Sequence, residues 1–366
     1  MDFSVTEGVM GYYDGVGISC EKSTWTVSKE TGTPTILIFN VKGMSHTMIP
    51  LIKGMVEYQD NPIAGVILNR CSKGMYQLMK PEIEEKLGIS VVGYFPQKEG
   101  IYIGSRHLGL MTAAEIDNLD EILSLLGETA EECIDLDLLL EIGEKAEPLT
   151  AVKRPEVLAE KRAKIAVAWD KAFCFYYKEN LEILEQLGAE LCYFSPVNDV
   201  QLPEDTDGIY LGGGYPELHI TELSNNVKMR NLIKNAIEKG LPTIAECGGF
   251  LYLHEHLEGA EMVGVVRGNA VLTKKLQPFG YVTLTAQDDN MLSACGGQIR
   301  AHEFHYAKSE NKGHDFVAEK PNGRKWPCVH TTKSLYAGFP HLFLRANIDF
   351  PEKFVRACME WSERRK

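Results

Sequence analysis

Short apolar runs alternate with longer amphipathic segments over the first hundred residues of the chain. The short runs are rich in Val, Ile and Phe, which is typical of buried strands, and the longer segments have helical spacing and length. This alternation predicts a mostly parallel, buried sheet. The predicted strands are FSVTEGV, PTILIFNV, IAGVILNR and SVVGYF at 3–9, 34–41, 63–70 and 90–95, and the predicted helices are SHTMIPLIKGMVEY and GMYQLMKPEIEEKLG at 45–58 and 74–88.

The pattern changes between residues 114 and 162, where charged segments of partly helical spacing replace the strand-like runs. Pro148 and Pro155 punctuate the end of this region. We therefore expect a helical linker over 114–162 that joins a domain at 1–113 to a second domain at 163–366.

Alternation of strand and helix resumes after the linker, and the last hundred residues are richer in strands and turns. The expected fold class is therefore α/β, with a parallel sheet in each of two domains. In the second domain the predicted strands lie at 164–170, 190–196, 207–218 and 241–246, and the predicted helices at 172–188 and 227–240.

Composition narrows the class of protein. The 366 residues are 44% hydrophobic and 24% charged, as in a globular protein with two ordinary cores. No apolar run approaches the roughly 18 residues of a membrane span, and the first ten residues lack signal-peptide features, so we expect a cytoplasmic location. The net charge of −13 argues against nucleic-acid binding. Nine cysteines without a CxxC pair argue against a disulfide framework or a zinc site.

The stretch GLPTIAECGGFLYL at 240–253 places Cys247 on a sharp turn between a predicted strand and a predicted helix. Backbone N–H groups at such a turn favour a thiolate and can hold a developing oxyanion. Gly248 and Gly249 let the backbone turn and let a substrate come close. A buried structural cysteine is the alternative interpretation. The glycine loop LGGGYPEL at 211–218 also ends a strand and favours catalysis, because it can supply a second oxyanion donor.

A cysteine nucleophile needs a base. The candidates lie in the last third of the chain: His254, His256, His302, His305 and His341. His254 and His256 follow the cysteine on the predicted helix, where a solvated position is the simpler expectation. His341 follows a turn in YAGFPHLFLRAN, a place from which a loop histidine can reach back to a strand end.

Together these segments resemble the class I glutamine amidotransferase domain and, more narrowly, the cobyrinic acid a,c-diamide synthase family. YLGGGYPELH, AECGGFLYL, HEFHY and AGFPHLFLRAN match its C-terminal half, and EGVMGYYDG, AGVILNR and RHLGL match its N-terminal half. The motifs follow the family's order over nearly the whole chain, which makes the resemblance more specific than any one motif.

The resemblance implies a flavodoxin-like second domain in which Cys247 is the glutaminase nucleophile and His341 its base and acid. Many class I domains have a carboxylate two residues after the histidine, but this chain has Phe343 there, which implies a Cys-His dyad. The implied oxyanion hole consists of Gly213, Gly214 and Gly248. The HEFHY segment is expected near the domain interface, with a structural role as the alternative.

The N-terminal half resembles the dethiobiotin-synthetase-like ATP-dependent ligases, whose fold is related to P-loop NTPases. The resemblance implies that Glu7 and Asp14 hold Mg²⁺ among nucleotide phosphates, since hard oxygen ligands suit that ion. It also implies that Asn69 reads the adenine edge. The alternatives are two loop acids and a strand-end cap. ATP, Mg²⁺ and L-glutamine are the implied co-substrates.

The P-loop of this family, roughly GxxSGxGKT, is not found in the sequence, and GYYDGVGISCEKST has the wrong spacing. Three explanations are open: a misplaced start or truncated gene, a separate P-loop-bearing polypeptide, or loss of ATP chemistry with the glutaminase kept. A sheet without its first strand has open edges, which would favour association, for example as a homodimer.

The resulting hypothesis is glutamine- and ATP-dependent amidation of the a and c carboxylates of cobyrinic acid, a tetrapyrrole polycarboxylate, in cobalamin biosynthesis. An acyl phosphate would react with ammonia made at Cys247. The alternatives are a,c-diamidation of another tetrapyrrole such as nickel-sirohydrochlorin, and a P-loop-less glutaminase subunit or pseudoenzyme that only binds its ligand.

Overall fold

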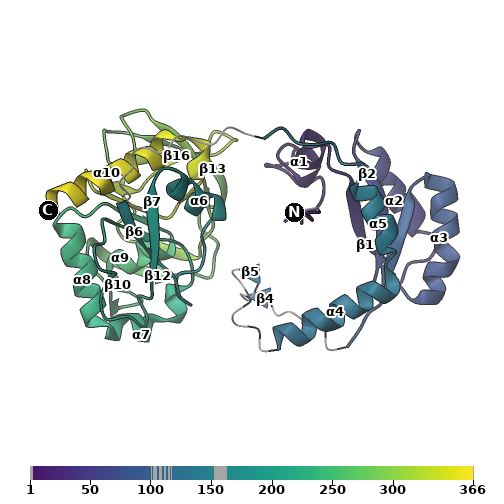
Figure 1. Ribbon diagram of the computed structural model, residues 1–366, viewed down its shortest axis with the longest axis horizontal. Helices are drawn as coiled ribbons and strands as arrows, with labels where there is room; N and C mark the ends of the chain where they lie inside the picture. Colours follow the sequence, from purple (N-terminus) through teal and green to yellow (C-terminus); the bar gives the residue numbers. More distant parts are fainter. Residues whose placement is uncertain are drawn as a thin grey trace. The chain divides into compact units, whose positions relative to one another are not determined.

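The computed structural model of the chain describes residues 3–99, 101, 105–106, 109–110, 113, 116, 118–151 and 163–365. It divides into two compact units, Met1–Val152 and Lys153–Lys366, both visible in Figure 1. Each unit contains a parallel sheet with helices packed on it, so the predicted α/β fold class is confirmed.

The first unit is built on a three-stranded parallel sheet in the order β1-β2-β3. Its apolar strand residues pack against helices α2 and α3, which contribute Met48, Ile52 and Ile83 to the core. Helix α3 begins where Ser72 caps the Met75 N–H and ends at Gly88, whose positive φ of 64° suits a helix stop. The elements are α1 (Thr24–Glu30), β1 (Thr35–Asn40), α2 (Met48–Glu57), β2 (Ile63–Asn69), α3 (Lys73–Leu87) and β3 (Ser90–Phe95).

The segment predicted as a linker is helical, but its helices pack against the sheet of the first unit. These are α4 (Leu119–Cys133) and α5 (Leu136–Gly143), after the short pair β4 (Ser105–Arg106) and β5 (Gly109–Leu110). Ile142 of α5 joins Ile67 and Val92 in a small core, and the Asp135 N–H donates to the Val92 carbonyl at 2.8 Å. Their apolar residues therefore cover the second face of the sheet, and the first compact unit extends beyond residue 113.

The strand predicted at 3–9 is wrong. Residues 3–8 have no regular structure, and Val5 and Val9 are exposed. Alternation of apolar and polar residues makes a strand only where a neighbouring strand supplies hydrogen-bond partners, and no described strand pairs with this segment.

The second unit is built on a six-stranded sheet in the order β18-β19-β9-β8-β6-β7. All neighbouring pairs are parallel except β18 with β19. Numbered along the chain, the parallel strands run 2-1-3-4-5, which is the flavodoxin-like order. These strands are β6 (Ala163–Ala168), β7 (Ala189–Phe194), β8 (Gly208–Leu211), β9 (Thr243–Glu246) and β19 (Leu335–Gly338), with β18 (His330–Thr331) at the edge.

Both faces of this sheet are covered. One face packs with α6 (Lys178–Gln186) and α10 (Asp349–Arg365), and the other with α8 (Val227–Glu238) and α9 (Gly248–Leu253). Two smaller sheets complete the unit, in the orders β11-β10-β12-β15 and β17-β16-β13-β14-β20. The remaining elements are η2 (Pro216–Leu218), α7 (Ile220–Asn225), β10 (His254–Leu257), β11 (Ala260–Glu261), β12 (Val266–Leu272), β13 (Gly280–Ala286), β14 (Gln298–Glu303), β15 (Ala307–Ser309), β16 (Phe316–Glu319), β17 (Lys325–Cys328), β20 (His341–Leu342) and η3 (Leu344–Ala346).

The helix predicted at 172–188 is shorter than its pattern indicates, because α6 begins only at Lys178. Residues 172–177 form a loop instead, and Phe175 makes an antiparallel bridge to Gly213. These tertiary hydrogen bonds replace the first helical turns.

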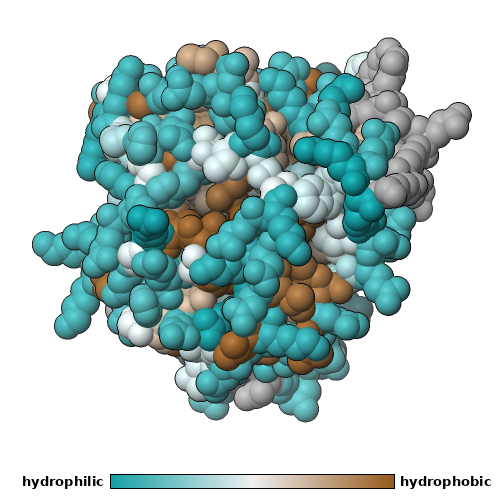
Figure 2. Space-filling view, turned by 90° about the vertical axis from the view of Figure 1, so that its left-hand side faces the viewer, coloured by the Kyte–Doolittle hydropathy of each residue, from teal (hydrophilic) through white to brown (hydrophobic). Residues whose placement is uncertain are grey.

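Among the described residues, no helix combines the length and the apolar character that crossing a bilayer requires. The face of the molecule in Figure 2 is mostly hydrophilic, with apolar side chains gathered toward its middle.

Candidate functional site

Cys247 lies directly after β9 and directly before α9, as the strand-turn-helix interpretation predicts. Its φ of 47° and ψ of −98° are unusual for a residue with a side chain. The turn is fixed on both sides: the Cys247 N–H donates to the Gly338 carbonyl at 2.9 Å, and its carbonyl accepts from the Leu251 N–H at 2.9 Å. A strained, tightly held backbone at a strand end is the geometry of a nucleophile elbow.

The glycine loop after β8 packs against this turn. A Cβ on Gly248 would lie 3.0 Å from the Gly214 nitrogen, and a Cβ on Gly249 would lie 2.2 Å from the Leu211 carbonyl oxygen. Gly214 has a φ of 153°, and a Cβ there would meet the Ala172 carbonyl oxygen at 2.1 Å. Glycine is therefore required for the close approach of the two loops.

The backbone of one predicted oxyanion position acts on the thiol. The Gly248 N–H lowers the pKa of Cys247, against the larger rise that burial causes. The Gly213 N–H donates instead to the Phe175 carbonyl at 3.2 Å, and two further N–H groups, from Cys174 and Phe175, donate to the Gly213 carbonyl. The polar groups of Gly213 are therefore engaged by the loop at 172–177, unlike the oxyanion donor that the resemblance implies.

His341 begins β20 and lies against Gly213. A Cβ on Gly213 would be only 2.4 Å from the His341 Cε1 and 3.3 Å from its Nδ1. Because Gly213 and Gly214 also contact Gly248, the imidazole, the glycine loop and the cysteine turn meet at the carboxyl edge of the sheet. The structure thus brings the five predicted residues of this site together.

Burial sets the protonation of the two reactive side chains. It raises the pKa of the Cys247 thiol above its usual range, and the charge of Glu217 adds to the rise. Burial lowers the pKa of His341 to about 4, with smaller contributions from His302 and His305. At neutral pH the resting pair is therefore a neutral thiol and a neutral imidazole, which is the correct state for a general base.

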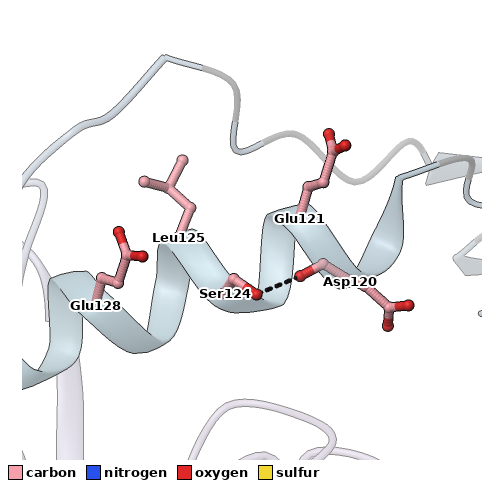
Figure 3. A pocket seen from close by; sticks show the side chains of 5 residues that line it. All are labelled: Asp120, Glu121, Ser124, Leu125 and Glu128. Carbon is pink, nitrogen blue, oxygen red and sulfur yellow. Dashed lines mark hydrogen bonds between the residues drawn. The ribbon is translucent and has the colours of Figure 1, made fainter.

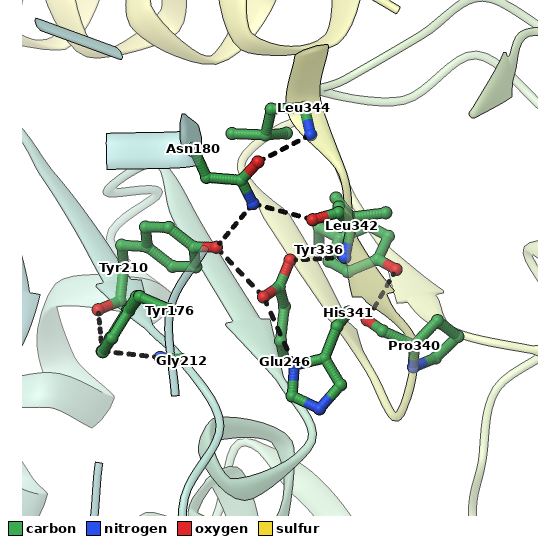
Figure 4. A network of polar contacts seen from close by, with 10 residues as sticks. All are labelled: Tyr176, Asn180, Tyr210, Gly212, Glu246, Tyr336, Pro340, His341, Leu342 and Leu344. Carbon is green, nitrogen blue, oxygen red and sulfur yellow. Dashed lines mark hydrogen bonds and ion pairs between the residues drawn. The ribbon is translucent and has the colours of Figure 1, made fainter. Parts of the chain in front are cut away.

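A buried polar network lies behind the imidazole, as Figure 4 shows. The Glu246 carboxylate, 2% exposed, accepts the Tyr210 hydroxyl at 3.0 Å and the Leu342 N–H at 2.9 Å, and its Oε2 lies 3.9 Å from the His341 Nδ1. Asn180 from α6 donates to the Leu342 carbonyl at 2.7 Å and accepts from the Leu344 N–H at 2.8 Å. No role for Glu246, Tyr210 or Asn180 was predicted from the sequence, although Glu246 directly precedes the cysteine.

Comparison with known proteins decides the family. Residues 164–347 match the CobB/CobQ-like glutamine amidotransferase domain. The chain is 40% identical over 373 residues to the cobyrinate a,c-diamide synthase of Caldanaerobacter subterraneus subsp. tengcongensis, covering 99% of this chain and 82% of that protein. The corresponding enzyme of Clostridium acetobutylicum is 42% identical over 97% of this chain and 82% of its own length, and that of Thermoplasma volcanium is 37% identical over 100% and 82%. This chain belongs to the cobyrinate a,c-diamide synthase family.

Three of the other candidate bases in this member of the synthase family lie at the edge of the site or within the fold. His302 pairs with His341 across β14 and β20, and His305 stacks on Phe339 with ring centroids 3.7 Å apart. His254 is fully buried and not solvated as expected, because the chain after α9 forms a strand. Its ring bonds the Phe250 carbonyl at 2.8 Å and the Ser309 hydroxyl at 2.7 Å, which makes it structural.

In the first unit, no hydrogen bond or ion pair among the described residues joins Glu7, Asp14 and Asn69, the residues that the synthase resemblance indicates. Glu7 and Asp14 are exposed, and the Asp14 N–H closes a turn on the Gly11 carbonyl at 2.9 Å. Asn69 ends β2, and its side chain accepts the N–H of the next residue, Arg70, at 2.9 Å, as a strand-end cap does. In the motif RHLGL at 106–110, residues 107 and 108 lie outside the described residues, and the other three belong to β4 and β5.

No cluster of three His, Cys, Asp or Glu side chains suited to a metal ion occurs within the described ranges. A depression on the surface of α4 is lined by Asp120, Glu121, Ser124, Leu125 and Glu128, all from one helix (Figure 3). Its carboxylates repel anions, so it is unsuited to a nucleotide or to the polycarboxylate substrate of this synthase family.

Proposed function

We propose that this chain amidates the a and c carboxylates of cobyrinate with nitrogen taken from glutamine, as the names of its relatives indicate. The observation that carries the proposal is the convergence of Cys247, His341 and the glycine loop at one sheet edge. The substrate is a tetrapyrrole, and glutamine and ATP are the co-substrates.

The geometry suits a thioester mechanism. The Cys247 sulfur attacks the side-chain amide carbon of glutamine while the His341 Nε2 takes the thiol proton. The N–H groups of Gly248 and Gly214 stabilise the oxyanion of the tetrahedral intermediate, and Gly213 leaves room for the imidazole. His341 then returns its proton to the leaving nitrogen, which departs as ammonia, and water hydrolyses the thioester to glutamate.

The second half of the reaction activates a substrate carboxylate. ATP phosphorylates the carboxylate, ammonia attacks the acyl carbon, and phosphate leaves. We assign this half to the first unit by the resemblance of its motifs, with Asn69 at the adenine. Glu7 and Asp14 are exposed, and by the same resemblance their carboxylates would hold Mg²⁺ among the nucleotide phosphates.

Glutamine-dependent and ammonia-dependent amidation by the purified full chain test the proposal. With ATP, Mg²⁺ and cobyrinate, glutamine should give glutamate and the diamide, detected by mass spectrometry. Cys247→Ala should abolish the reaction with glutamine and preserve the reaction with ammonium chloride. Cys295→Ala, at an exposed cysteine, is the matched control and should retain both reactions.

Two outcomes would contradict the proposal in different ways. Glutamine use that survives in Cys247→Ala would remove the assigned nucleophile. Glutamine hydrolysis with no amide formed from either nitrogen source would instead leave a glutaminase without the amidation.

A further inference from the structure

The carboxylate of Glu246 is the only described acidic group that faces the imidazole of His341 in an ion-pair geometry. Glu246 ends β9, next to Cys247, and its side chain is 3% exposed against 14% for that of His341. Figure 4 shows the carboxylate directed at the Nδ1 of His341, with the second ring nitrogen on the side of the ring away from it. One ring nitrogen therefore faces a carboxylate, and the other points away from it.

The carboxylate is held by two donors from different strands. The Tyr210 hydroxyl from β8 donates to Oε2, and the Leu342 N–H from β20 donates to Oε1. Asn180 lies 3.5 Å from the Tyr210 hydroxyl and bonds the backbone of Leu342 and Leu344. The same network thus fixes the carboxylate and the backbone on the C-terminal side of His341.

Position 343, where many class I domains have their carboxylate, contributes no acid here. The ring of Phe343 is 37% exposed and packs edge-on against Tyr177, and its N–H donates to the Arg300 carbonyl at 3.1 Å. The Cys-His dyad expected from the sequence therefore has no carboxylate two residues after His341, but it has the carboxylate of Glu246 at the end of β9.

We propose that Glu246 is the positioning residue of His341, so that the site works as a triad whose acid directly precedes the nucleophile. The inference rests on the proposed function. The carboxylate holds the proton on Nδ1, which leaves the Nε2 lone pair for the thiol proton, and it stabilises the imidazolium that forms. The separation of 3.9 Å is long for a hydrogen bond, as is common before substrate binds, and it shortens when the ring becomes charged.

A purely structural role predicts different behaviour, because Glu246 also fastens β20 through the Leu342 N–H. Glu246→Gln separates the two roles: the amide oxygen can still accept that N–H, but the charge is lost. If the role is positioning, kcat for glutamine hydrolysis falls at least about tenfold above pH 8, where Glu246 is ionised, with the loss of a triad aspartate as the upper bound. KM for glutamine and amidation with free ammonia stay within about twofold, since neither binding nor the ammonia-dependent half uses the imidazole.

The pH profile gives a second readout. Burial raises the pKa of Glu246 to about 8, although the hydrogen bonds from the Leu342 N–H and the Tyr210 hydroxyl lower it. The groups that interact with it are Tyr176, Tyr177, Tyr210, Tyr336, Cys247 and His341. Burial raises the pKa of the tyrosines and the thiol, so these stay neutral below pH 8. The acid limb of the wild-type kcat profile should then lie near pH 8 and move to lower pH in Glu246→Gln.

The experiment measures glutamate formation by the full chain with ATP and cobyrinate present, from pH 5 to 9, together with thermal unfolding. Glu246→Asp, which keeps the charge on a shorter side chain, should recover part of the activity lost in Glu246→Gln. If Glu246→Gln prevents folding, Glu246→Asp and the pH profile of the wild type still test the inference. An acid limb of the wild-type kcat profile near pH 4 to 5 would contradict it.

Failure of the inference and failure of the proposed function are distinguishable. A wild-type chain that never hydrolyses glutamine overturns the proposed function and the inference with it. An active wild type with an equally active Glu246→Gln variant, or one changed only in KM or in stability, overturns the inference alone.

Discussion

The two α/β units of this chain differ at the carboxyl ends of their parallel strands. In the second unit, the segments that follow β8, β9 and β19 contact one another and gather Gly213, Gly248, Cys247 and His341. In the first unit, the motif acids lie before the first strand, and the Asn69 side chain bonds only its neighbour Arg70 among the described residues. Motif residues form a candidate site only where the strand ends bring them together. The glutaminase site of the second unit is therefore supported by geometry, whereas the ATP site of the first unit is supported by the resemblance of its motifs.

The largest expected effect comes from removing the imidazole. His341→Asn should lower glutamine-dependent turnover by about 10²–10⁴-fold, which is the usual contribution of a general base. Amidation with ammonium chloride should persist, because that route bypasses Cys247. Parallel assays with the two nitrogen sources check this, and equal losses with both sources would mean that the substitution damages the fold.

Crowding the imidazole should have the next largest effect. Gly213→Ala places a Cβ 2.4 Å from the His341 Cε1, so the ring must move. A displacement of about 1 Å can cost about 10²-fold in rate, and we expect kcat for glutamine hydrolysis to fall by about that factor. Gly127→Ala on α4, where a Cβ meets no atom within 4 Å, is the control and should keep full activity. Unchanged kinetics in Gly213→Ala would show that Gly213 does not contribute to the glutaminase site.

The histidines and the glutamates buried in the second unit respond to acid in opposite directions. Burial lowers the pKa of His254, His305 and His341 to about 4, whereas a histidine in the unfolded chain titrates near its ordinary value of 6.5. At these positions the unfolded state binds more protons, and stability is lost as the pH falls from 6.5 toward 4, by about 1–3 kcal/mol per histidine. Burial raises the pKa of Glu246 to about 8 and that of Glu303 to about 7, so the folded state binds more protons at these two groups and gains stability as the pH falls. Between pH 7 and pH 5 the two effects largely offset each other.

Hydrogen exchange followed by mass spectrometry can compare the units at pH 7 and pH 5. Protection of the second unit should change little in the wild type, because the histidines and the two glutamates offset each other. His341→Asn should change the dependence on pH by about one proton, and an identical dependence in wild type and variant would contradict the assigned burial of this ring.

The smallest effect is expected in the first unit. If Asn69 reads the adenine edge, Asn69→Ala removes about one hydrogen bond and should raise KM for ATP by about three- to tenfold. KM for glutamine should not change. Initial rates at varied ATP, with ammonium chloride as nitrogen source, measure this without the glutaminase, and an unchanged KM would leave Asn69 as the cap that it is in the described fold.

Local pattern was enough to predict β1 to β3, β6 to β9, most helices and the cysteine elbow, but it also predicted a strand at 3–9 that the structure does not have. Apolar runs between turn residues give these strands, and Glu-Cys-Gly-Gly after such a run indicates the turn. Contacts between residues far apart in the sequence could not be predicted from the local pattern. The bridge from Phe175 to Gly213 shortens α6, and the pairing of Glu246 with His341 joins residues 95 positions apart that no periodicity connects. Glu246 was visible beside the cysteine, but only the fold shows which way its carboxylate points.

Asn180 has a consequence for the order in which the protein becomes active. Its amide lies near the start of the second unit, yet it fastens backbone groups 162 and 164 residues later in the chain. During translation the anchor is made first, and the segment it holds, next to the imidazole, follows only after the separation of 162 to 164 residues. A growing polypeptide that has not reached residue 341 therefore has the thiol without its base, and the pair forms only once β20 is made.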